Sequence, residues 1–113
     1  MHEASIMQEA LAQAEAHARQ RGCTAIHALW LRVGALSGVV PEALEFAFEA
    51  LKPRTLAAGA TLRIERVEAR ALCPACRREF TLEDAVFPCP DCGGWESTLL
   101  RGRELDLVRI EAS

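Results

Sequence analysis

The feature that most constrains this chain is a doubled Cys-Pro-x-Cys motif in its C-terminal half. Cys73-Pro74-Ala75-Cys76 and Cys89-Pro90-Asp91-Cys92 are separated by 12 residues. Each short pair can form a tight turn that points two sulfur atoms at one ion. Two such turns supply four thiolates in a tetrahedron, a set that suits Zn²⁺. The predicted zinc ligands are therefore Cys73, Cys76, Cys89 and Cys92.

The donor set also indicates the kind of site. The last histidine of the chain is His27, so no imidazole is available near the cysteines. Four thiolates leave no open position for water, which predicts a structural rather than a catalytic zinc. Two alternatives stay open: a rubredoxin-type iron centre with the same spacing, and redox-active thiol pairs, although a thioredoxin-like motif normally occurs once, near a βαβ pattern.

Composition limits the class of protein. The 113 residues carry a net charge of −3 and five cysteines, and no apolar run approaches the length of a membrane span. The first residues lack the basic and apolar regions of a signal peptide, so we expect a cytoplasmic location and no membrane partner. Residues 69–100 carry a charge of −2, which argues against a grip on nucleic-acid phosphates.

Hydrophobic periodicity predicts two helices. Ser5 to Gln8 resembles a capping box, so the first helix is expected over residues 5–21, with Ser5 as N-cap and Gly22 as its end. Pro41 is placed to open the second helix, and Pro53 to stop it.

Three strands are predicted from alternation and from β-branched residues, over residues 26–33, 61–68 and 104–111. The fold class is accordingly α+β: a small two-helix, three-stranded-sheet domain with an inserted zinc ribbon. The expected boundaries are residues 1–68 plus 101–113 for the α/β domain and 69–100 for the ribbon.

The N-terminus offers a second metal site. The free amine of Met1, the imidazole of His2 and deprotonated backbone amides can form fused chelate rings around a square-planar ion, a geometry that suits Ni²⁺ or Cu²⁺. Glu3 could serve as an outer ligand or orient His2.

Taken together, these parts resemble the HypA/HybF family of hydrogenase nickel-incorporation proteins. The resemblance covers essentially the whole chain in order. It is carried by Met1-His2-Glu3 with Ser5, by residues 33–42, by Leu44 to Phe48, by the two cysteine pairs with Phe80, and by Gly102-Arg103-Glu104-Leu105 with Ile110-Glu111.

The resemblance implies a nickel metallochaperone, not an enzyme. It implies an α/β nickel-binding domain joined to a zinc ribbon, nickel bound at Met1, His2 and Glu3, and structural zinc at the four cysteines. It also implies delivery of nickel to a hydrogenase large-subunit precursor together with the GTPase HypB. Urease maturation proteins are possible further partners, and the chain itself is expected as a monomer or a homodimer.

One departure from the family concerns histidines. Some members carry histidines beside the ribbon cysteines, and this sequence has none there, so metal sensing by exchange with histidine is not expected. The competing function is a zinc-ribbon module that binds protein or nucleic acid.

The remaining candidate residues are interpreted more plainly. His17 is expected at the surface, His27 at the edge of the core, and Cys23 as a small buried or half-buried side chain. Trp30 and Trp95 are interpreted as packing residues. Three glutamates of the second helix form either a solvated face or a docking surface: Glu42, Glu45 and Glu49. No phosphate-binding loop or catalytic triad is found, in line with a protein that is not an enzyme.

Overall fold

The computed structural model describes residues 3–83 and 87–113, and the chain forms two compact units. Unit 1 is built from the chain up to Arg32 together with Val39–Glu65 and Asp106–Ser113. Unit 2 is built from Val33–Gly38 and Arg66–Leu105. Each unit is described by itself below.

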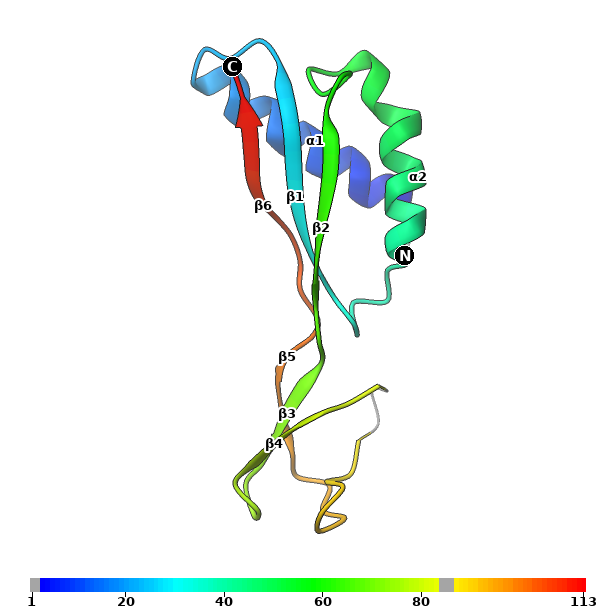
Figure 1. Ribbon diagram of the computed structural model, residues 1–113, viewed down its shortest axis with the longest axis vertical. Coiled ribbons are helices and arrows are strands. Elements are labelled where there is room, and N and C mark those ends of the chain that lie inside the picture. Colours follow the sequence, from blue (N-terminus) through cyan, green and yellow to red (C-terminus); the bar gives the residue numbers. More distant parts are fainter. Residues whose placement is uncertain (1–2, 84–86) are drawn as a thin grey trace. The chain divides into compact units, whose positions relative to one another are not determined.

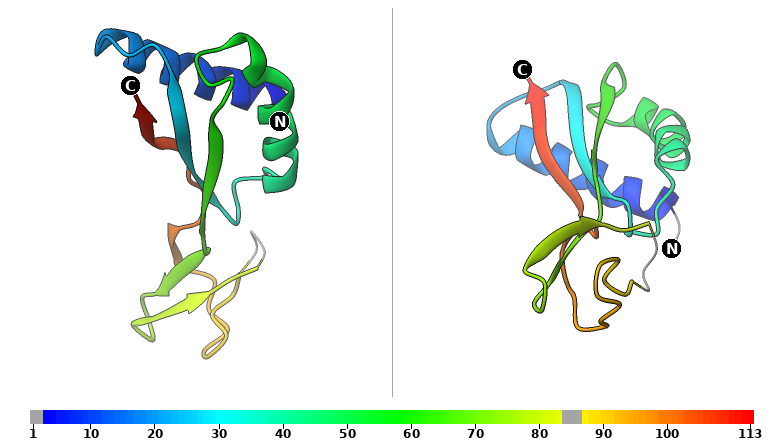
Figure 2. Two further views of the ribbon diagram at one scale, coloured as in Figure 1. Left: turned by 45° about the horizontal axis from the view of Figure 1, so that its top comes forward. Right: turned by 60° about the horizontal axis from the view of Figure 1, so that its bottom comes forward.

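Unit 1 contains two helices and a three-stranded sheet in the strand order β2-β1-β6. Helix α1 lies across one face of the sheet, as Figures 1 and 2 show, and α2 packs against α1. The α+β prediction of two helices and a three-stranded sheet is confirmed. The elements are α1 (Glu3–Gln20), β1 (Ile26–Gly34), α2 (Pro41–Leu51), the short 3-10 turn η1 (Lys52–Arg54), β2 (Thr61–Val67) and β6 (Leu105–Ala112).

Helix α1 differs from the prediction at its start. The prediction that Ser5 is the N-cap is wrong, because Glu3 and Ala4 are already helical. An acidic residue in the first turn is favourable beside the exposed N–H groups of a helix, and alanine is the strongest helix former, so the helix extends past the serine.

The end of α1 is as predicted from Gly22. Gly22 has a φ of 72°. Its amide donates to the carbonyl of Arg19, and the amide of Cys23 donates to the carbonyl of Ala18. This pair of hydrogen bonds is a Schellman motif, which needs a left-handed residue where glycine stands.

The core of unit 1 lies between the sheet and the helices. Leu29 and Leu31 share one face of β1, and both are buried. On the other face, the Trp30 ring packs under the Arg109 guanidinium, 4.5 Å from ring centroid to carbon, so the prediction of a packing role holds for Trp30. The largest fully buried side chains are Phe48, Met7, Ile26, Leu29 and Leu44.

Unit 2 is a small antiparallel sheet in the strand order β4-β3-β5. Its strands are β3 (Arg70–Cys73), β4 (Arg78–Thr81) and β5 (Thr98–Arg101), and none of them was predicted individually. Its core is small: Ala69, Ala71 and Leu82 are buried, and four partly buried side chains pack against them, Leu36, Phe80, Phe87 and Leu99. Trp95 is 69% exposed, so the prediction of a packing role is wrong for this tryptophan.

Three backbone segments of unit 2 cross at two glycines. A Cβ on Gly34 would lie 2.1 Å from the carbonyl oxygen of Gly102, and a Cβ on Gly102 would lie 2.6 Å from the Cα of Ala69. The amides of Gly34 and Leu36 donate to the carbonyls of Glu104 and Gly102. Segment 33–38 is thereby hydrogen-bonded to the strand ends of this unit.

Neither helix in the described part of the chain combines the length and the apolar character that a bilayer crossing demands.

Candidate metal centre

The first cysteine pair sits where β3 turns into β4. Cys73 is the last residue of β3, and Arg78 opens β4, so Cys76 lies in the turn between them. The amide of Arg77 donates to the carbonyl of Cys73 at 2.7 Å, and Arg77 has a φ of 56°. This left-handed residue closes the turn and directs both sulfurs to one side.

The second pair repeats the same turn outside regular structure. The amide of Gly93 donates to the carbonyl of Cys89 at 2.8 Å, and Gly93 has a φ of 73°. The amide of Cys89 donates to the carbonyl of Gly94, which closes the loop from the other side. The Gly93-Gly94 pair therefore permits the turn, because glycine adopts a positive φ without steric cost.

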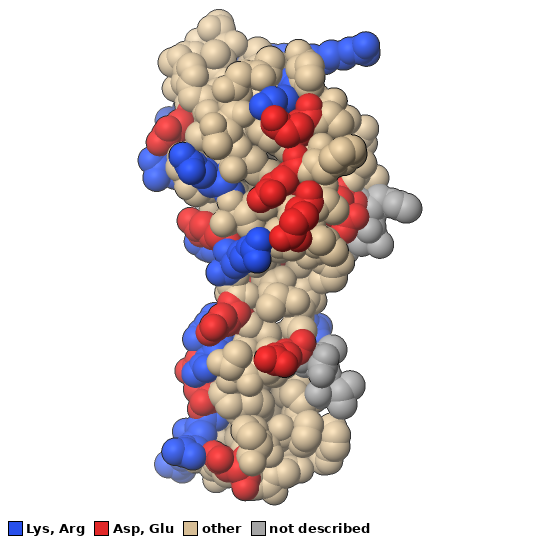
Figure 3. All heavy atoms as spheres, turned by 45° about the vertical axis from the view of Figure 1, so that its right-hand side comes forward, with Lys and Arg blue, Asp and Glu red and all other residues tan. Residues whose placement is uncertain are grey.

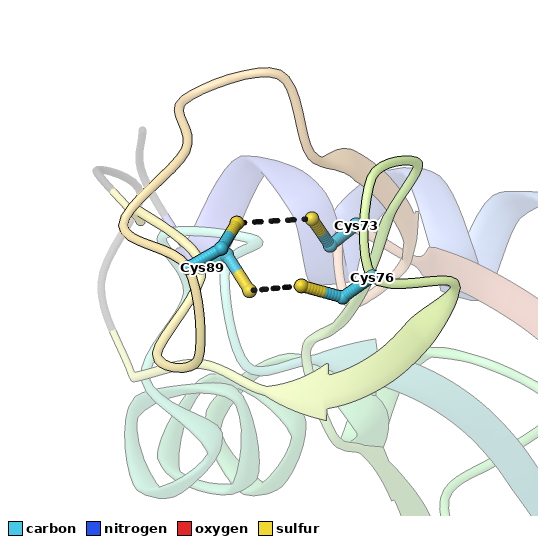
Figure 4. Close-up of side chains that lie close together, drawn as sticks. Cys73, Cys76 and Cys89 are labelled. Atoms are coloured by element: carbon cyan, nitrogen blue, oxygen red, sulfur yellow. Dashed lines mark hydrogen bonds between the residues drawn. The ribbon is translucent and has the colours of Figure 1, made fainter.

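The two turns bring four sulfurs together. The Sγ atoms of Cys73 and Cys92 are 3.7 Å apart, and those of Cys89 and Cys76 are 3.9 Å apart. All four ligand atoms lie within 4.8 Å of one another. Figure 4 shows the side chains of Cys73 and Cys76 pointing toward the turn that contains Cys89. This is the sole group of three or more potential metal ligands in the described ranges 3–83 and 87–113.

These spacings fit a zinc ion. Four thiolates bound tetrahedrally at about 2.3 Å from a central Zn²⁺ lie about 3.8 Å from one another. A disulfide would instead need sulfurs about 2.05 Å apart, and all of these cysteines are free. The donor set and its dimensions thus match a closed four-thiolate site.

Three of the clustered thiols have shifted pKa values: Cys73, Cys76 and Cys92. A backbone hydrogen bond from Cys76 lowers the pKa of Cys73 to about 7, whereas the hydrogen bond with Cys92 raises the pKa of Cys76 to about 12. For Cys92, the Gly94 amide and the Cys76 thiol favour the thiolate, but the Cys73 and Cys89 thiols and burial raise its pKa on balance. Four thiolates this close repel one another, so full ionisation requires a metal that displaces the protons.

Other contacts brace the site. The guanidinium of Arg78 and the carboxylate of Asp91 form an ion pair at 2.8 Å that joins the two turns. The amide of Gly94 donates to the Sγ of Cys92 at 3.4 Å. Such donors stabilise thiolate charge around a metal and orient the ligands.

A second polar group of unit 2 was missed by the sequence analysis. Glu79 on β4 accepts from Arg70 on β3 at 3.1 Å and from Arg101 on β5 at 2.5 Å. These hydrogen bonds lower the pKa of Glu79. This cluster could not be predicted from the sequence. Which charged side chains are neighbours across a sheet depends on the strand register, and the sequence does not give that register.

The predicted nickel ligands fall partly outside the described residues. Met1 and His2 lie outside them, so their placement stays a prediction. Glu3 begins α1, and its carboxylate accepts from the amide of Val40 at 3.4 Å, next to the start of α2. Glu3 thus connects the first helical turn to the residue that precedes α2.

The other histidines and the lone cysteine belong to unit 1 and are not members of the four-cysteine cluster. His17 is exposed, as predicted. His27 is exposed rather than at the core edge, and its Nε2 lies 2.7 Å from the Ser113 hydroxyl. Cys23 is half-buried, as predicted, and with His17 it lines a surface pocket of about 440 Å³ beside β6.

Comparison with known proteins gives matches over the whole length. Residues 1–112 match the family model described as hydrogenase/urease nickel incorporation, metallochaperone, hypA. Hydrogenase maturation factors HypA of Picosynechococcus sp. and Geotalea uraniireducens are 46% and 44% identical over 111 residues, covering 98% of each chain.

Solved structures show the same fold. The solution structure of the Ni metallochaperone HypA from Helicobacter pylori is similar with a TM-score of 0.69 at 24% identity, covering 99% of this chain and 97% of the other. A second solution structure, of a HypA protein, has a TM-score of 0.72 at 23% identity.

Proposed function

We propose, from the premise that this chain belongs to the HypA family of hydrogenase and urease nickel-incorporation metallochaperones, that it binds Ni²⁺ at its own N-terminus and delivers it to a hydrogenase large-subunit precursor. In this proposal the chain carries a metal and catalyses no reaction. We propose that nickel binding belongs to residues 1–68 plus 101–113 and zinc binding to residues 69–100, the ribbon segment to which residues 33–38 of unit 2 add backbone hydrogen bonds.

The observation that supports separate roles for zinc and nickel is the cluster of four cysteine sulfurs, which lie within 4.8 Å of one another. Cys73, Cys76, Cys89 and Cys92 match the spacing of a four-thiolate zinc site, in which every coordination position is filled by the protein. A metal held this way stabilises its surroundings and exchanges slowly. We therefore assign zinc a structural role and place the transferable nickel elsewhere in the chain.

For nickel we propose the amine of Met1, the imidazole of His2 and the backbone nitrogens of His2 and Glu3. These nitrogens can surround Ni²⁺ in a square plane, and the imidazole and amine bind in their neutral forms, so nickel competes with protons. The Glu3 carboxylate accepts a hydrogen bond from the amide of Val40, so the residue that follows His2 in the sequence lies beside the start of α2.

The proposed partners follow from the family. They are the GTPase HypB and a hydrogenase large-subunit precursor, with the proteins of urease maturation as further candidates. The expected cytoplasmic location, the absence of nucleic-acid binding and the monomer or homodimer state remain predictions.

The nickel site can be tested with three versions of the protein: the authentic chain, His2→Ala, and a chain with a short tag left in front of Met1. We expect one zinc per chain in all three by elemental analysis. In calorimetry, only the authentic chain should bind nickel at the proposed site, because the substitution removes the imidazole and the tag removes the free amine.

The matched control is His17→Ala, which changes an exposed histidine of α1 and should leave nickel binding intact. Equal nickel affinity of the tagged and authentic chains would show that the N-terminal amine is not a ligand, and the proposed site would be wrong.

A further inference from the structure

Strand β6 forms one edge of the sheet of unit 1. In the strand order β2-β1-β6, its hydrogen-bonded neighbour among the described strands is β1, and no described strand pairs with its other side. Figure 1 shows β6 as an outer strand of this sheet. The strand spans eight residues and contains neither proline nor glycine. Such an edge presents backbone N–H and C=O groups that can pair with another strand.

The pairing with β1 determines which backbone groups of β6 face outward. Ser113, directly after β6, and Ala25, directly before β1, exchange both of their backbone hydrogen bonds, at 2.9 and 3.1 Å. Successive residues of a strand direct their backbone groups to opposite sides, so Glu111 and Arg109 also face β1. The alternate residues direct their N–H and C=O groups to the open edge: Val108, Ile110 and Ala112.

A hollow of about 440 Å³ lies along β6. It is lined by residues of this strand and by residues at the end of α1, among them Ala18 and Cys23. Val108 is 36% exposed, and Ile110 and Ala112 are half-buried, so apolar side chains of the edge-facing residues remain partly open to solvent in the hollow. A strand added beside β6 would place its own apolar side chains against them.

The other face of β6 carries two opposite charges. Arg109 and Glu111 form an ion pair at 2.9 Å, and their side chains remain 61% and 51% exposed. The Arg109 guanidinium also lies over the ring of Trp30. These contacts hold the two charges in a fixed order along the strand and leave both accessible to a neighbouring strand.

These features make β6 complementary to a second copy of itself. An antiparallel pair of β6 strands with a two-fold axis at Ile110 places Val108 of one copy opposite Ala112 of the other. The outward-facing residues then form the hydrogen-bonded pairs of the ladder. In the same register, Arg109 of each copy lies opposite Glu111 of the other.

The charges select this register. The four charged side chains alternate in sign, because the Arg109–Glu111 pair of one copy meets the same pair of the other in reversed order, and opposite charges across a ladder are favourable. A two-fold axis at Val108 would instead place Arg109 opposite Leu107 and leave its charge without a partner on the second strand.

We propose that the open edge of β6 binds β6 of a second copy of this chain, antiparallel and centred on Ile110, so that the two sheets join into one continuous sheet. The apolar residues of each copy that line the hollow are covered by those of the other. This interface is independent of the nickel site proposed above, so the two can be tested separately.

The sharpest test uses two charge reversals, Arg109→Glu and Glu111→Arg, in the full zinc-loaded chain. Analytical ultracentrifugation over a series of concentrations gives the dissociation constant of the dimer. Each variant alone places like charges opposite one another twice, so we expect dimerisation about tenfold weaker or more. An equimolar mixture pairs an acidic strand with a basic one, and should dimerise at least as tightly as the authentic chain.

Rescue by mixing separates a contact between copies from a change within one chain, because a misfolded variant is not repaired by a second variant. A further variant, Val108→Lys, puts a charge on the open edge, as natural edge strands do to prevent pairing. We expect it to be folded by circular dichroism and monomeric at concentrations at which the authentic chain is a dimer.

The matched controls reverse charges elsewhere in unit 1. Arg63→Glu changes an exposed residue of β2, the strand at the other edge of the sheet. Glu45→Arg changes an exposed residue of α2, on a side of unit 1 where Figure 3 shows acidic side chains gathered. Both variants should dimerise like the authentic chain.

Three results would overturn the proposal. The first is an authentic chain that stays monomeric up to about 1 mM, a concentration at which even weak specific pairs associate. The second is a dimer that Val108→Lys leaves intact, which would place the contact elsewhere. The third is a mixture of folded Arg109→Glu and Glu111→Arg chains that dimerises no better than either variant alone.

Discussion

Among single residues, Glu79 shows how much of the zinc ribbon depends on cross-strand charges. Its carboxylate lies between the guanidinium groups of Arg70 and Arg101 and so links all three strands of unit 2. Arg70 also donates to the Thr81 hydroxyl on β4. In a sheet whose strands have four residues each, a polar cluster of this kind replaces part of the packing that a larger core would supply.

The charge of Glu79 gives a prediction about pH. Its pKa in the folded chain is lowered by Arg70 and Arg101, so the ionised carboxylate stabilises the fold above the unfolded pKa of about 4.3, and this contribution is lost as pH falls through the folded pKa. We expect Glu79→Gln to be less stable than the authentic chain at pH 7, with a difference that shrinks in acid. Carboxyl resonances followed by NMR should give the folded pKa directly.

The matched comparison uses two arginines. Arg101→Gln should raise the pKa of Glu79, whereas Arg109→Gln, which removes a guanidinium paired with Glu111 in the other unit, should leave it unchanged. An identical Glu79 titration in the authentic chain and in Arg101→Gln would contradict the assignment of the lowered pKa to this cluster.

At the scale of the elements, the crossing of Gly34, Gly102 and Ala69 fixes how closely three backbone segments approach. Gly102 has a φ of 129°, and a Cβ added to this residue would lie 2.6 Å from the Cα of Ala69. Both the backbone angle and the lack of space exclude a side chain, so this position has no alternative to glycine.

We predict that Gly102→Ala destabilises unit 2 by more than about 1 kcal/mol, because alanine is strained at positive φ and here also overlaps the backbone. The matched control is Gly59→Ala, where an added Cβ meets nothing within 4 Å and no positive φ is present. Thermal unfolding of the zinc-loaded variants measures both. Equal melting temperatures for the two variants would show that the crossing tolerates a side chain.

The elements also show how much of the secondary structure can be predicted from the sequence. The helices and the strands β1, β2 and β6 were predictable within a few residues, because their apolar side chains repeat with the period of the element and face one core. The strands β3, β4 and β5 were not, since four-residue strands are too short to show a clear alternation of apolar and polar residues. The start of α1 was misjudged because a serine inside a helix resembles a cap.

The candidate site was predictable in part for a similar reason. The spacing of the cysteines alone predicted that Cys73, Cys76, Cys89 and Cys92 share one site, because two cysteines separated by two residues can form a tight turn. The structure brings the four sulfurs together. The 78% exposure of Phe46 on α2 was not predictable, since the helical period marks Leu44, Ala47 and Phe48 as the core side but does not say whether a partner covers the opposite one.

For the whole molecule, the two units should respond differently to loss of zinc. Unit 1 contains both helices and the largest buried side chains, so its stability comes from hydrophobic packing. Unit 2 has three buried apolar residues in its core cluster, and a core of this size needs a metal for stability.

We predict that a strong chelator unfolds unit 2 and leaves unit 1 folded. The helical signal in far-UV circular dichroism should persist, while amide resonances of residues 66–105 collapse toward random-coil positions in NMR spectra. Added zinc should restore them. Simultaneous loss of the helical signal would show that the ribbon metal maintains the entire chain rather than one unit.

Unit 2 is assembled from two separate stretches of sequence, Val33–Gly38 and Arg66–Leu105. Leu36 packs against its core, and the amide of Leu36 donates to Gly102. A gene fragment that encodes only the cysteine-bearing stretch would therefore lack part of the folded structure. The cysteine-bearing stretch is consequently not an independent module that recombination or cloning can move into another protein. A fusion protein that is to contain the folded ribbon must also include the segment after β1.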